Sequence, residues 1–309
     1  MNRDSVDWKG YIPAITTPFT EDGDFDPDGF GELVEWLVAE GMHGIAVAGT
    51  TGEWFALTAR ERKELFRLAG EQIDGRITVL GGCSSFTPAE TIEYAHAAQA
   101  AGLDGILLTP PPYVVPGPRE VVAFYESVSA AVDIPICVYN WPRGTNVDLS
   151  VDTLRRLAEV RNIVAIKNST GDLGRFLDGF FALKEEVRYF GVPMNELGIT
   201  LLRHHGADGT IGAGAVLGSD HPRFFDHVWA GDLDAARRCG ARDRVLFEDW
   251  INADYSTRFG SPQAIMKAAL NLRGLPGGYP RPPLLPLTED EIERVRTTLA
   301  QLDLVAVAA

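Results

Sequence analysis

Short apolar segments alternate with longer segments of helical periodicity along most of the chain. The apolar segments are continuous, as is typical of parallel strands that are covered on both faces. Their starts are separated by 22 to 33 residues, which is the length of one βα unit. The pattern predicts eight strands, beginning near Tyr11, Gly44, Ile77, Gly105, Ile134, Ile163, Val187 and Gly209.

Helix starts between these strands are marked by capping residues. Thr58 with Glu61, and Thr87 with Glu90, both predict capping boxes, the second followed by proline at the first helical position. Eight βα units favour a closed (β/α)8 TIM barrel over an open doubly wound sheet, which typically stops at about five to six strands. The absence of GxGxxG after the first strand also weakens the dinucleotide-binding alternative.

The chain continues beyond the eighth unit with segments that have only helical periodicity. We expect the barrel to occupy residues 1–230 and to carry the active site. Residues 231–309 are expected to form a helical extension packed on the barrel, covering one end or forming a subunit interface. Its predicted helices span 233–251 and 262–272, with a last one that Thr288 caps.

Composition and charge narrow the possible partners. The 309 residues are 45% hydrophobic and 23% charged, as in a globular protein with a large core. The formal net charge is 28 − 43 = −15, which argues against nucleic acid or an anionic membrane as a partner. No apolar stretch approaches the roughly 18 residues of a membrane span, and the first ten residues have no signal-peptide core. Three cysteines without metal-ligand spacing fit a reducing cytoplasm, which we expect.

Lys167 is the most informative single residue, because it ends the apolar run 162–166. Only five of the 28 basic residues are lysines, so arginine is the usual cation in this chain. A buried lysine can have its pKa lowered by up to roughly 3–5 units and then attack a carbonyl to form a Schiff base. The alternative is a strand-end lysine whose amine reaches water.

The GTTGE segment that follows the second strand is a candidate ligand-binding turn. Catalytic groups of such barrels lie at the carboxyl ends of strands. The hydroxyls and N–H groups of Thr50 and Thr51, between Gly49 and Gly52, can bind a carboxylate or oxyanion. The alternative is an ordinary βα turn.

Two tyrosines also follow strands. Tyr139 ends the fifth strand, where its phenol can transfer protons to a carbinolamine or only pack in the core. Tyr113 follows three prolines after the fourth strand, a rigid loop that directs it away from its own barrel.

The alternative to a lysine mechanism is a metal-dependent aldolase. The six histidines form no HxH or HExxH pattern, so we expect no metal site.

Three motifs taken together resemble one known family. GTTGE at 49–53, YN-x-P at 139–142 and IK-x-x-TGD at 166–172 are similar to motifs of the dihydrodipicolinate synthase/N-acetylneuraminate lyase family. Thr50 and Tyr139 are 89 residues apart, and Tyr139 and Lys167 are 28 apart, which agrees with the family. The resemblance spans the whole chain. It implies a class I, pyruvate-type aldolase or related lyase that needs no external cofactor.

The resemblance also implies a role for each matching residue. Lys167 would form the Schiff base with the keto carbon of a 2-oxo acid, and Tyr139 would be the proton shuttle. Thr50 would join a proton relay with Tyr139, and Thr51 would bind the substrate carboxylate. Tyr113 matches the tyrosine that family members donate across a dimer interface. A homotetramer built as a dimer of dimers is implied.

The chain departs from the synthase pattern at positions that affect the second substrate. Arg143 lies one residue earlier than the synthase arginine, and Gly144 occupies that arginine's position. Trp54 replaces the usual serine after GTTGE, and Trp141 is also bulky. Aspartate-semialdehyde as the acceptor is therefore in doubt.

The expected substrate-binding set is completed by residues of several loops. Asn195 follows the seventh strand, where it either binds sugar hydroxyls or begins a helix. Gly49, Gly52, Ile211 and Arg143 are further expected substrate-binding residues.

The leading hypothesis is a Schiff-base lyase that acts on pyruvate or a 2-keto-3-deoxy sugar acid, by retro-aldol cleavage or dehydration. The alternative is 4-hydroxy-tetrahydrodipicolinate synthase, which uses pyruvate and aspartate-semialdehyde. The non-enzymatic alternative is a barrel that binds 2-oxo acids without turnover.

Overall fold

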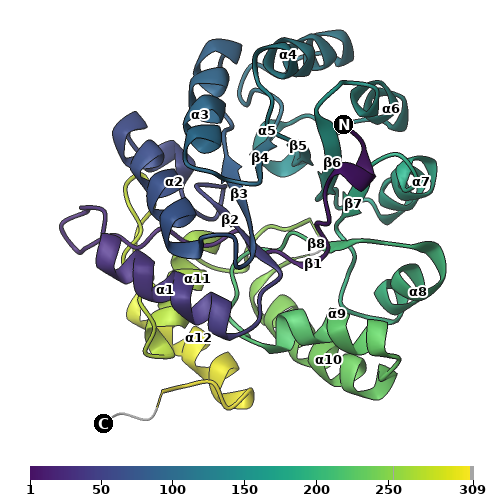
Figure 1. Cartoon of the computed structure of the whole chain (residues 1–309). Helices are drawn as coiled ribbons and strands as arrows, with labels where there is room; N and C mark the ends of the chain where they lie inside the picture. Colours follow the sequence, from purple (N-terminus) through teal and green to yellow (C-terminus); the bar gives the residue numbers. More distant parts are fainter. Residues whose placement is uncertain (253, 307–309) are drawn as a thin grey trace.

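A computed structural model describes residues 1–252 and 254–306. Its eight parallel strands form one sheet in the order β1-β8-β7-β6-β5-β4-β3-β2 (Figure 1). Each predicted strand begins within two residues of an observed one, so the strand predictions are confirmed. The strands are β1 (Gly10–Tyr11), β2 (Gly44–Val47), β3 (Thr78–Gly82), β4 (Gly105–Leu108), β5 (Ile136–Asn140), β6 (Ile163–Asn168), β7 (Arg188–Phe190) and β8 (Gly209–Thr210).

The sheet closes on itself through the segment that follows β1. Ala14 forms one parallel bridge to Ala46 of β2 and a second to Ala213 after β8. The alternating helices cover the outer face, as a ring around the sheet. The chain therefore has the predicted (β/α)8 TIM-barrel fold with additional C-terminal helices.

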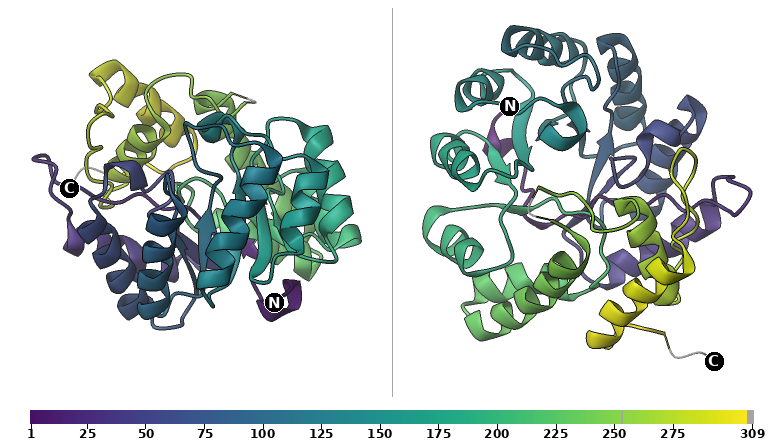
Figure 2. Two further views of the ribbon diagram at one scale, coloured as in Figure 1. Left: turned by 90° about the horizontal axis from the view of Figure 1, so that it is seen from above. Right: turned by 180° about the vertical axis from the view of Figure 1, so that it is seen from behind.

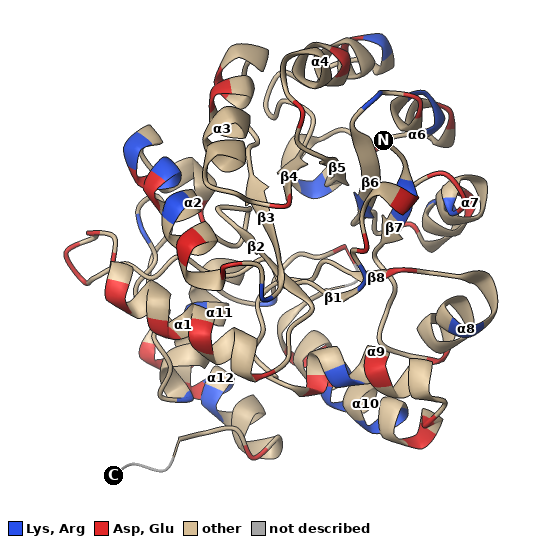
Figure 3. Ribbon diagram, in the orientation of Figure 1, with Lys and Arg blue, Asp and Glu red and all other residues tan. Residues whose placement is uncertain are grey.

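Figure 3 shows Lys, Arg, Asp and Glu residues along the helices of the outer ring. The strands between them carry few charged residues. The helices are α1 (Pro27–Ala39), α2 (Ala59–Ile73), α3 (Pro88–Ala100), α4 (Pro118–Ala131), α5 (Pro142–Thr145), α6 (Val151–Ala158), α7 (Leu173–Leu183), α8 (Glu196–His205), α9 (Asp220–Ala230), α10 (Leu233–Trp250), α11 (Pro262–Leu272) and α12 (Glu289–Gln301), with short 3-10 helices η1 (Arg3–Ser5) and η2 (Trp54–Ala56).

The predicted helix caps are confirmed at α2 and only half confirmed at α3. Thr58 accepts from the N–H of Glu61, whose carboxylate accepts from the N–H of Thr58, completing the capping box. Thr87 accepts from the N–H of Glu90, but the Glu90 carboxylate instead accepts from Ser85 Oγ at 2.7 Å. The second capping box fails because a closer hydroxyl takes the carboxylate.

The chain beyond α9 is helical, as predicted, and contributes most of a separate hydrophobic cluster that also includes Val216 and Leu217. Figure 2 shows α12 and the N-terminus on opposite sides of the barrel. The buried indole of Trp250 on α10 donates to Thr298 of α12 at 3.0 Å, and Thr288 caps α12. The expected boundary at residue 230 falls between α9 and α10 and stays a prediction.

No helix in the described part of the chain is long and apolar enough to span a membrane.

The barrel interior is packed with side chains rather than open. Alternate residues of each strand point into the barrel, because successive side chains of a strand point to opposite faces. The interior cluster consists of Trp8, Ile12, Ala14, Ala46, Leu80, Leu107, Cys137, Tyr139, Val164, Ala165, Phe190 and Ile211.

Candidate active site

Lys167 and Tyr139 lie together at the carboxyl ends of two neighbouring strands. They are register partners in the β5–β6 pair. Each follows an interior residue by two positions, Ala165 and Cys137 respectively, so both side chains point into the barrel. Lys167 Nζ lies 3.9 Å from the centre of the Tyr139 ring. The side chains are buried, with 5% of Lys167 and 6% of Tyr139 exposed.

The amine of Lys167 is held in an apolar environment. Burial lowers the pKa of Lys167 from its ordinary 10.5 to about 8, against a smaller opposing effect of Cys137. None of the ion pairs among residues 1–252 and 254–306 involves this amine. About a tenth of the Lys167 amine is therefore neutral, and nucleophilic, at pH 7.

The phenol of Tyr139 lies among other hydroxyl groups. Burial raises the pKa of Tyr139 well above its ordinary value, and hydrogen bonds with Ser169 and Thr50 oppose that rise. Trp141 stacks on the ring of Tyr139, with centroids 5.8 Å apart. Tyr255, from the chain after α10, contacts Trp141 edge-on at 5.9 Å. Ser169 and Thr50 are thus the hydroxyl neighbours of the Tyr139 phenol.

The segment 49–53 presents backbone donors beside this pair of residues. In the described part of the chain, the N–H groups of Thr50 and Thr51 have no hydrogen-bond acceptor. Ala48 and Glu53, at either end, adopt the left-handed conformation with φ of 50° and 56°. Consecutive free N–H groups of this kind can bind an oxyanion.

Gly52 is required by a close approach of two backbones. A Cβ at this position would lie 3.0 Å from the carbonyl oxygen of Ile15 and 3.1 Å from the nitrogen of Ala48. At Gly49 the nearest atom would be 3.8 Å away, so space does not require glycine there. The close packing of this turn against Ile15 and Ala48 therefore depends on Gly52.

A buried amide network holds the ends of β5 and β6 together on the outer face. Asn140 Nδ2 donates to Asn168 Oδ1 at 2.9 Å and to Asp148 Oδ1 at 2.9 Å. Asn168 Nδ2 in turn donates to the hydroxyl of Tyr189 at 2.8 Å. Asn140 and Asn168 directly follow Tyr139 and Lys167, so the network fixes the two strands that carry the site.

Tyr113 lies outside this cluster. Its side chain is 90% exposed, on the proline-rich loop after β4, and its φ is 75°. Val114 and Val115 beside it are 63% and 47% exposed. The loop directs Tyr113 away from the interior of its own barrel, as the prolines suggested.

The remaining predicted substrate-binding residues lie in three different environments. Ile211 is buried in the interior cluster. Arg143 is exposed on the single-turn helix α5, 3.7 Å from the carboxylate of Asp254. Asn195 caps α8: its Oδ1 accepts from the N–H groups of Leu197 and Gly198. Asn195 therefore begins a helix, which is the alternative to binding sugar hydroxyls. Its amide oxygen is already used by these two hydrogen bonds.

Sequence reasoning missed two hydroxyl residues at the site. Ser169 lies two residues after Lys167, so strand alternation alone could have indicated it. Tyr255 lies in the C-terminal helical part, where neither strand spacing nor a motif gives any signal. It reaches the mouth of the barrel only through the packing of that part of the chain.

The histidines do not gather around a metal site in the described residues. No group of three His, Cys, Asp or Glu side chains there lies close enough to hold a metal ion. His204 and His205 lie at the end of α8, and His96 is exposed on α3.

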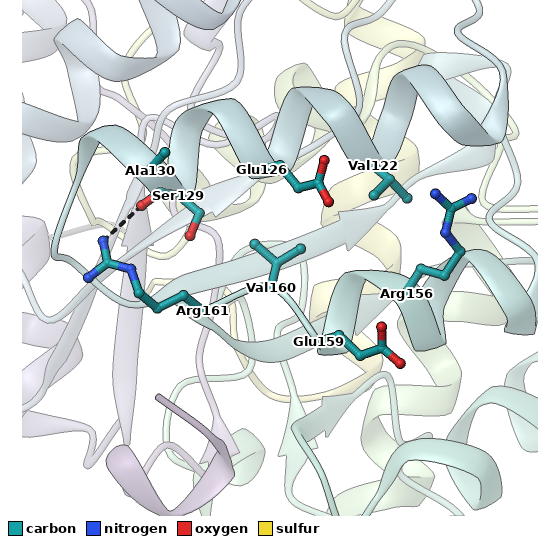
Figure 4. Close-up of a pocket in the computed structure, with 8 residues that line it drawn as sticks. All are labelled: Val122, Glu126, Ser129, Ala130, Arg156, Glu159, Val160 and Arg161. Carbon is teal, nitrogen blue, oxygen red and sulfur yellow. Dashed lines mark hydrogen bonds between the residues drawn. The ribbon is translucent and has the colours of Figure 1, made fainter.

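A separate hollow lies in the outer helical layer between α4 and α6 (Figure 4). Acidic and basic side chains line it together, and Arg161 closes one end by donating to the carbonyl of Ser129 at 3.0 Å. None of the predicted site residues lines it. Its lining residues are Val122, Glu126, Ser129, Ala130, Arg156, Glu159, Val160 and Arg161.

Known proteins share both the sequence and the fold. A sequence model of the dihydrodipicolinate synthetase family matches residues 7–302. The 4-hydroxy-tetrahydrodipicolinate synthase of an Azoarcus species is 36% identical over 301 residues, covering 94% of this chain and 97% of that protein. An uncharacterised DapA-like lyase of Rhizobium meliloti is 31% identical over 303 residues, covering 96% and 97%. The structure of Acinetobacter baumannii dihydrodipicolinate synthase complexed with pyruvate has a TM-score of 0.84 at 30% identity, covering 96% of this chain and 99% of that one.

Proposed function

The chain belongs to the dihydrodipicolinate synthetase family of class I, aldolase-type lyases, and on that premise we propose that Lys167 forms a Schiff base with a 2-oxo acid. Pyruvate or a 2-keto-3-deoxy sugar acid is the proposed substrate. On the sugar acid, the reaction is either retro-aldol cleavage or loss of water. No external cofactor takes part in the proposed chemistry.

In the proposed reaction, the neutral amine of Lys167 attacks the keto carbon and gives a carbinolamine. The phenol of Tyr139 passes a proton to the carbinolamine hydroxyl, which leaves as water and gives the protonated imine. The imine withdraws electrons from C2. In cleavage, the C4 hydroxyl loses its proton, the C3–C4 bond breaks and C4 leaves as an aldehyde, which gives an enamine that is then protonated at C3. In dehydration, C3 loses a proton and the resulting enamine expels the C4 hydroxyl, which takes up a proton and leaves as water. Hydrolysis of the imine then regenerates Lys167.

The neighbouring hydroxyl and backbone groups complete the proposal. Thr50 shares the proton of Tyr139, and its position beside that phenol supports the relay. The free N–H groups of Thr50 and Thr51 bind the carboxylate next to the keto group. Binding by backbone donors is needed here because the protein carries a net charge of −15, which disfavours anionic ligands overall.

One observation carries this proposal: a buried lysine without an ionic partner in the described residues, 3.9 Å from a buried tyrosine ring at the mouth of a barrel. Burial disfavours the charged form of the amine, which is the requirement for nucleophilic attack. A lysine with only a structural role would gain more from an acidic partner or from water.

Borohydride reduction with a panel of 2-oxo acids tests the proposal. Purified protein is reduced in the presence of each acid, digested, and its peptides are weighed by mass spectrometry. We expect one adduct per chain on the peptide that contains Lys167. If no acid gives an adduct, or if the adduct lies on another lysine, the proposed chemistry is wrong.

The second candidate is 4-hydroxy-tetrahydrodipicolinate synthase. It is favoured by the name of the 36% identical Azoarcus relative. Against it, Arg143 is exposed and lies near Asp254, and Trp141 and Tyr255 occupy the mouth on the side of β5. Robust turnover of pyruvate with aspartate-semialdehyde would establish this activity instead.

We also propose that the protein is a cytoplasmic homotetramer, a dimer of dimers, in which Tyr113 reaches a neighbouring subunit. The exposed loop at residues 113–115 supports this assembly, because three large hydrophobic side chains there lie in water in the single chain. The buried free thiols of Cys83, Cys137 and Cys239 fit a reducing compartment.

A further inference from the structure

Two side chains of α11 contact the segment 49–53 from outside the barrel. Gln263 and Lys267 lie four residues apart, so they project from the same face of the helix. Gln263 Nε2 donates to the carbonyl oxygen of Thr50 at 2.9 Å. Lys267 Nζ lies 2.5 Å from Glu53 Oε1. Both side chains of α11 are buried, with 5% of Gln263 and 1% of Lys267 exposed.

The bond from Gln263 fixes the direction of one peptide group. The carbonyl of Thr50 and the N–H of Thr51 belong to the same planar, trans peptide, so they point in opposite directions. The Thr50 carbonyl also accepts from the N–H of Glu53 at 3.1 Å, which occupies its second lone pair. The N–H of Thr51 is therefore held pointing away from α11.

Lys267 holds the other end of the same segment. Glu53 has a φ of 56°, a conformation that non-glycine residues keep only where surrounding contacts impose it. One carboxylate oxygen of Glu53 pairs with Lys267, and the other accepts from the N–H of Arg281 at 2.9 Å. Lys267 also donates to the carbonyl of Tyr279 at 2.6 Å. The C-terminal helical part thus contacts both ends of the turn.

We propose that α11 orients the carboxylate-binding backbone of the site, with Gln263 as a positioning residue for the N–H of Thr51. Lys267 keeps the segment in place through Glu53. This inference rests on the proposed function, because it assigns that N–H to the carboxylate of a 2-oxo acid. It gives the C-terminal helices a part in substrate binding.

The test compares two side-chain amides of the same helix. Gln263→Met removes the donor and keeps the length of the side chain. Asn271→Leu is the matched control, because Asn271 Nδ2 donates to a backbone carbonyl of another loop, that of Gly278, at 3.0 Å. For each variant, borohydride trapping is measured as a function of pyruvate concentration, and thermal stability is measured alongside.

We expect Gln263→Met to raise the pyruvate concentration for half-maximal trapping by about 3- to 10-fold, the scale of one lost hydrogen bond. At saturation the adduct should still be one per chain. Methyl pyruvate lacks the anionic carboxylate, and a hydrogen bond to a neutral ester is weaker than one to a carboxylate. Its concentration for half-maximal trapping should therefore change by at most about 2-fold. Asn271→Leu should leave the pyruvate dependence unchanged even where it lowers the melting temperature.

Each other outcome has a distinct meaning. An unchanged pyruvate dependence in Gln263→Met, or an equal increase in Asn271→Leu, overturns the role of Gln263 and leaves the Schiff base intact. Absence of any adduct in the unmodified protein overturns the proposed function and this inference with it. If Gln263→Met does not fold, Gln263→Ala removes the same donor with less demand on packing, and the same criteria apply.

Discussion

Tyr139 and Lys167 are register partners on neighbouring strands, and the amine of Lys167 lies 3.9 Å from the centre of the Tyr139 ring. Two residues 28 positions apart in the chain therefore meet because parallel strands place equivalent positions at the same height. The network of Asn140 and Asn168 behind them keeps that register. The relationship determines what each substitution at the site should do.

The two buried lysines should respond in opposite ways to the same substitution. Lys167→Met should raise the free energy of unfolding at pH 7 by roughly 1–3 kcal/mol, because it removes an amine that burial disfavours in its charged form. Lys267→Met should lower it by about 3–5 kcal/mol, because it leaves the Glu53 carboxylate buried without its partner.

Urea denaturation followed by circular dichroism measures both changes. Lys167→Met should also lose all adduct formation with pyruvate, whereas the folded fraction of Lys267→Met should still form it. A destabilised Lys167→Met variant would show that this amine has a stabilising partner.

Tyr139→Phe should separate binding from proton transfer. The ring and its packing against Trp141 are kept, so pyruvate should still be trapped on Lys167. Turnover should fall by about 10²- to 10⁴-fold, the usual contribution of a positioned acid–base group. Steady-state kinetics with the identified substrate measures the loss, and normal turnover in this variant would remove the proton-shuttle role.

Adduct formation should depend on pH through Lys167. The pKa of this amine is about 8, and only its neutral form is nucleophilic, so the trapping rate should rise with pH and reach half its maximum near pH 8. Initial rates of borohydride trapping between pH 6 and 10 give the profile. A rate that stays flat across this range would contradict a titrating nucleophile.

The lowered pKa of Lys167 also predicts how the stability of the fold depends on pH. Between pH 8 and 10.5 the unfolded chain binds a proton at Lys167 that the folded chain does not, so this residue makes stability rise with pH in that window. The rise should be smaller in Lys167→Met, which lacks the titrating group.

Assembly should depend on the loop after β4. Tyr113→Lys should weaken the association of subunits, because it places a charge within the exposed hydrophobic loop. Sedimentation velocity should show a lower average mass, and turnover should fall with it. Leu285→Lys is the control, since Leu285 is 76% exposed elsewhere and should leave both unchanged. An unaltered mass for Tyr113→Lys would exclude this loop from the interface.

The sequence was sufficient to predict the barrel, because its eight buried strands are continuous apolar runs separated by one βα unit each. The apolar run predicts that the sixth strand ends at Lys167, and the observed strand extends one residue further, to Asn168. Strand alternation then places Tyr139 and Lys167 on the inner face, so these two residues could be found together without coordinates.

Other parts of the site depend on packing between distant segments and left no local pattern. Tyr255 approaches Trp141, and Gln263 approaches Thr50, across 114 and 213 residues of chain respectively. For Asn195 the signal in the sequence has two meanings. Its position after a strand is compatible with a substrate-binding residue and with a helix cap, and only the hydrogen bonds of its Oδ1 identify the cap.

The contact between α11 and the segment 49–53 has a consequence for biosynthesis. Gln263 leaves the ribosome 213 residues after Thr50, and Lys267 follows it. A nascent chain can therefore pair all eight strands while the turn beside Lys167 still lacks its outer support. The nucleophile gains its fully ordered surroundings only after α11 has been synthesised.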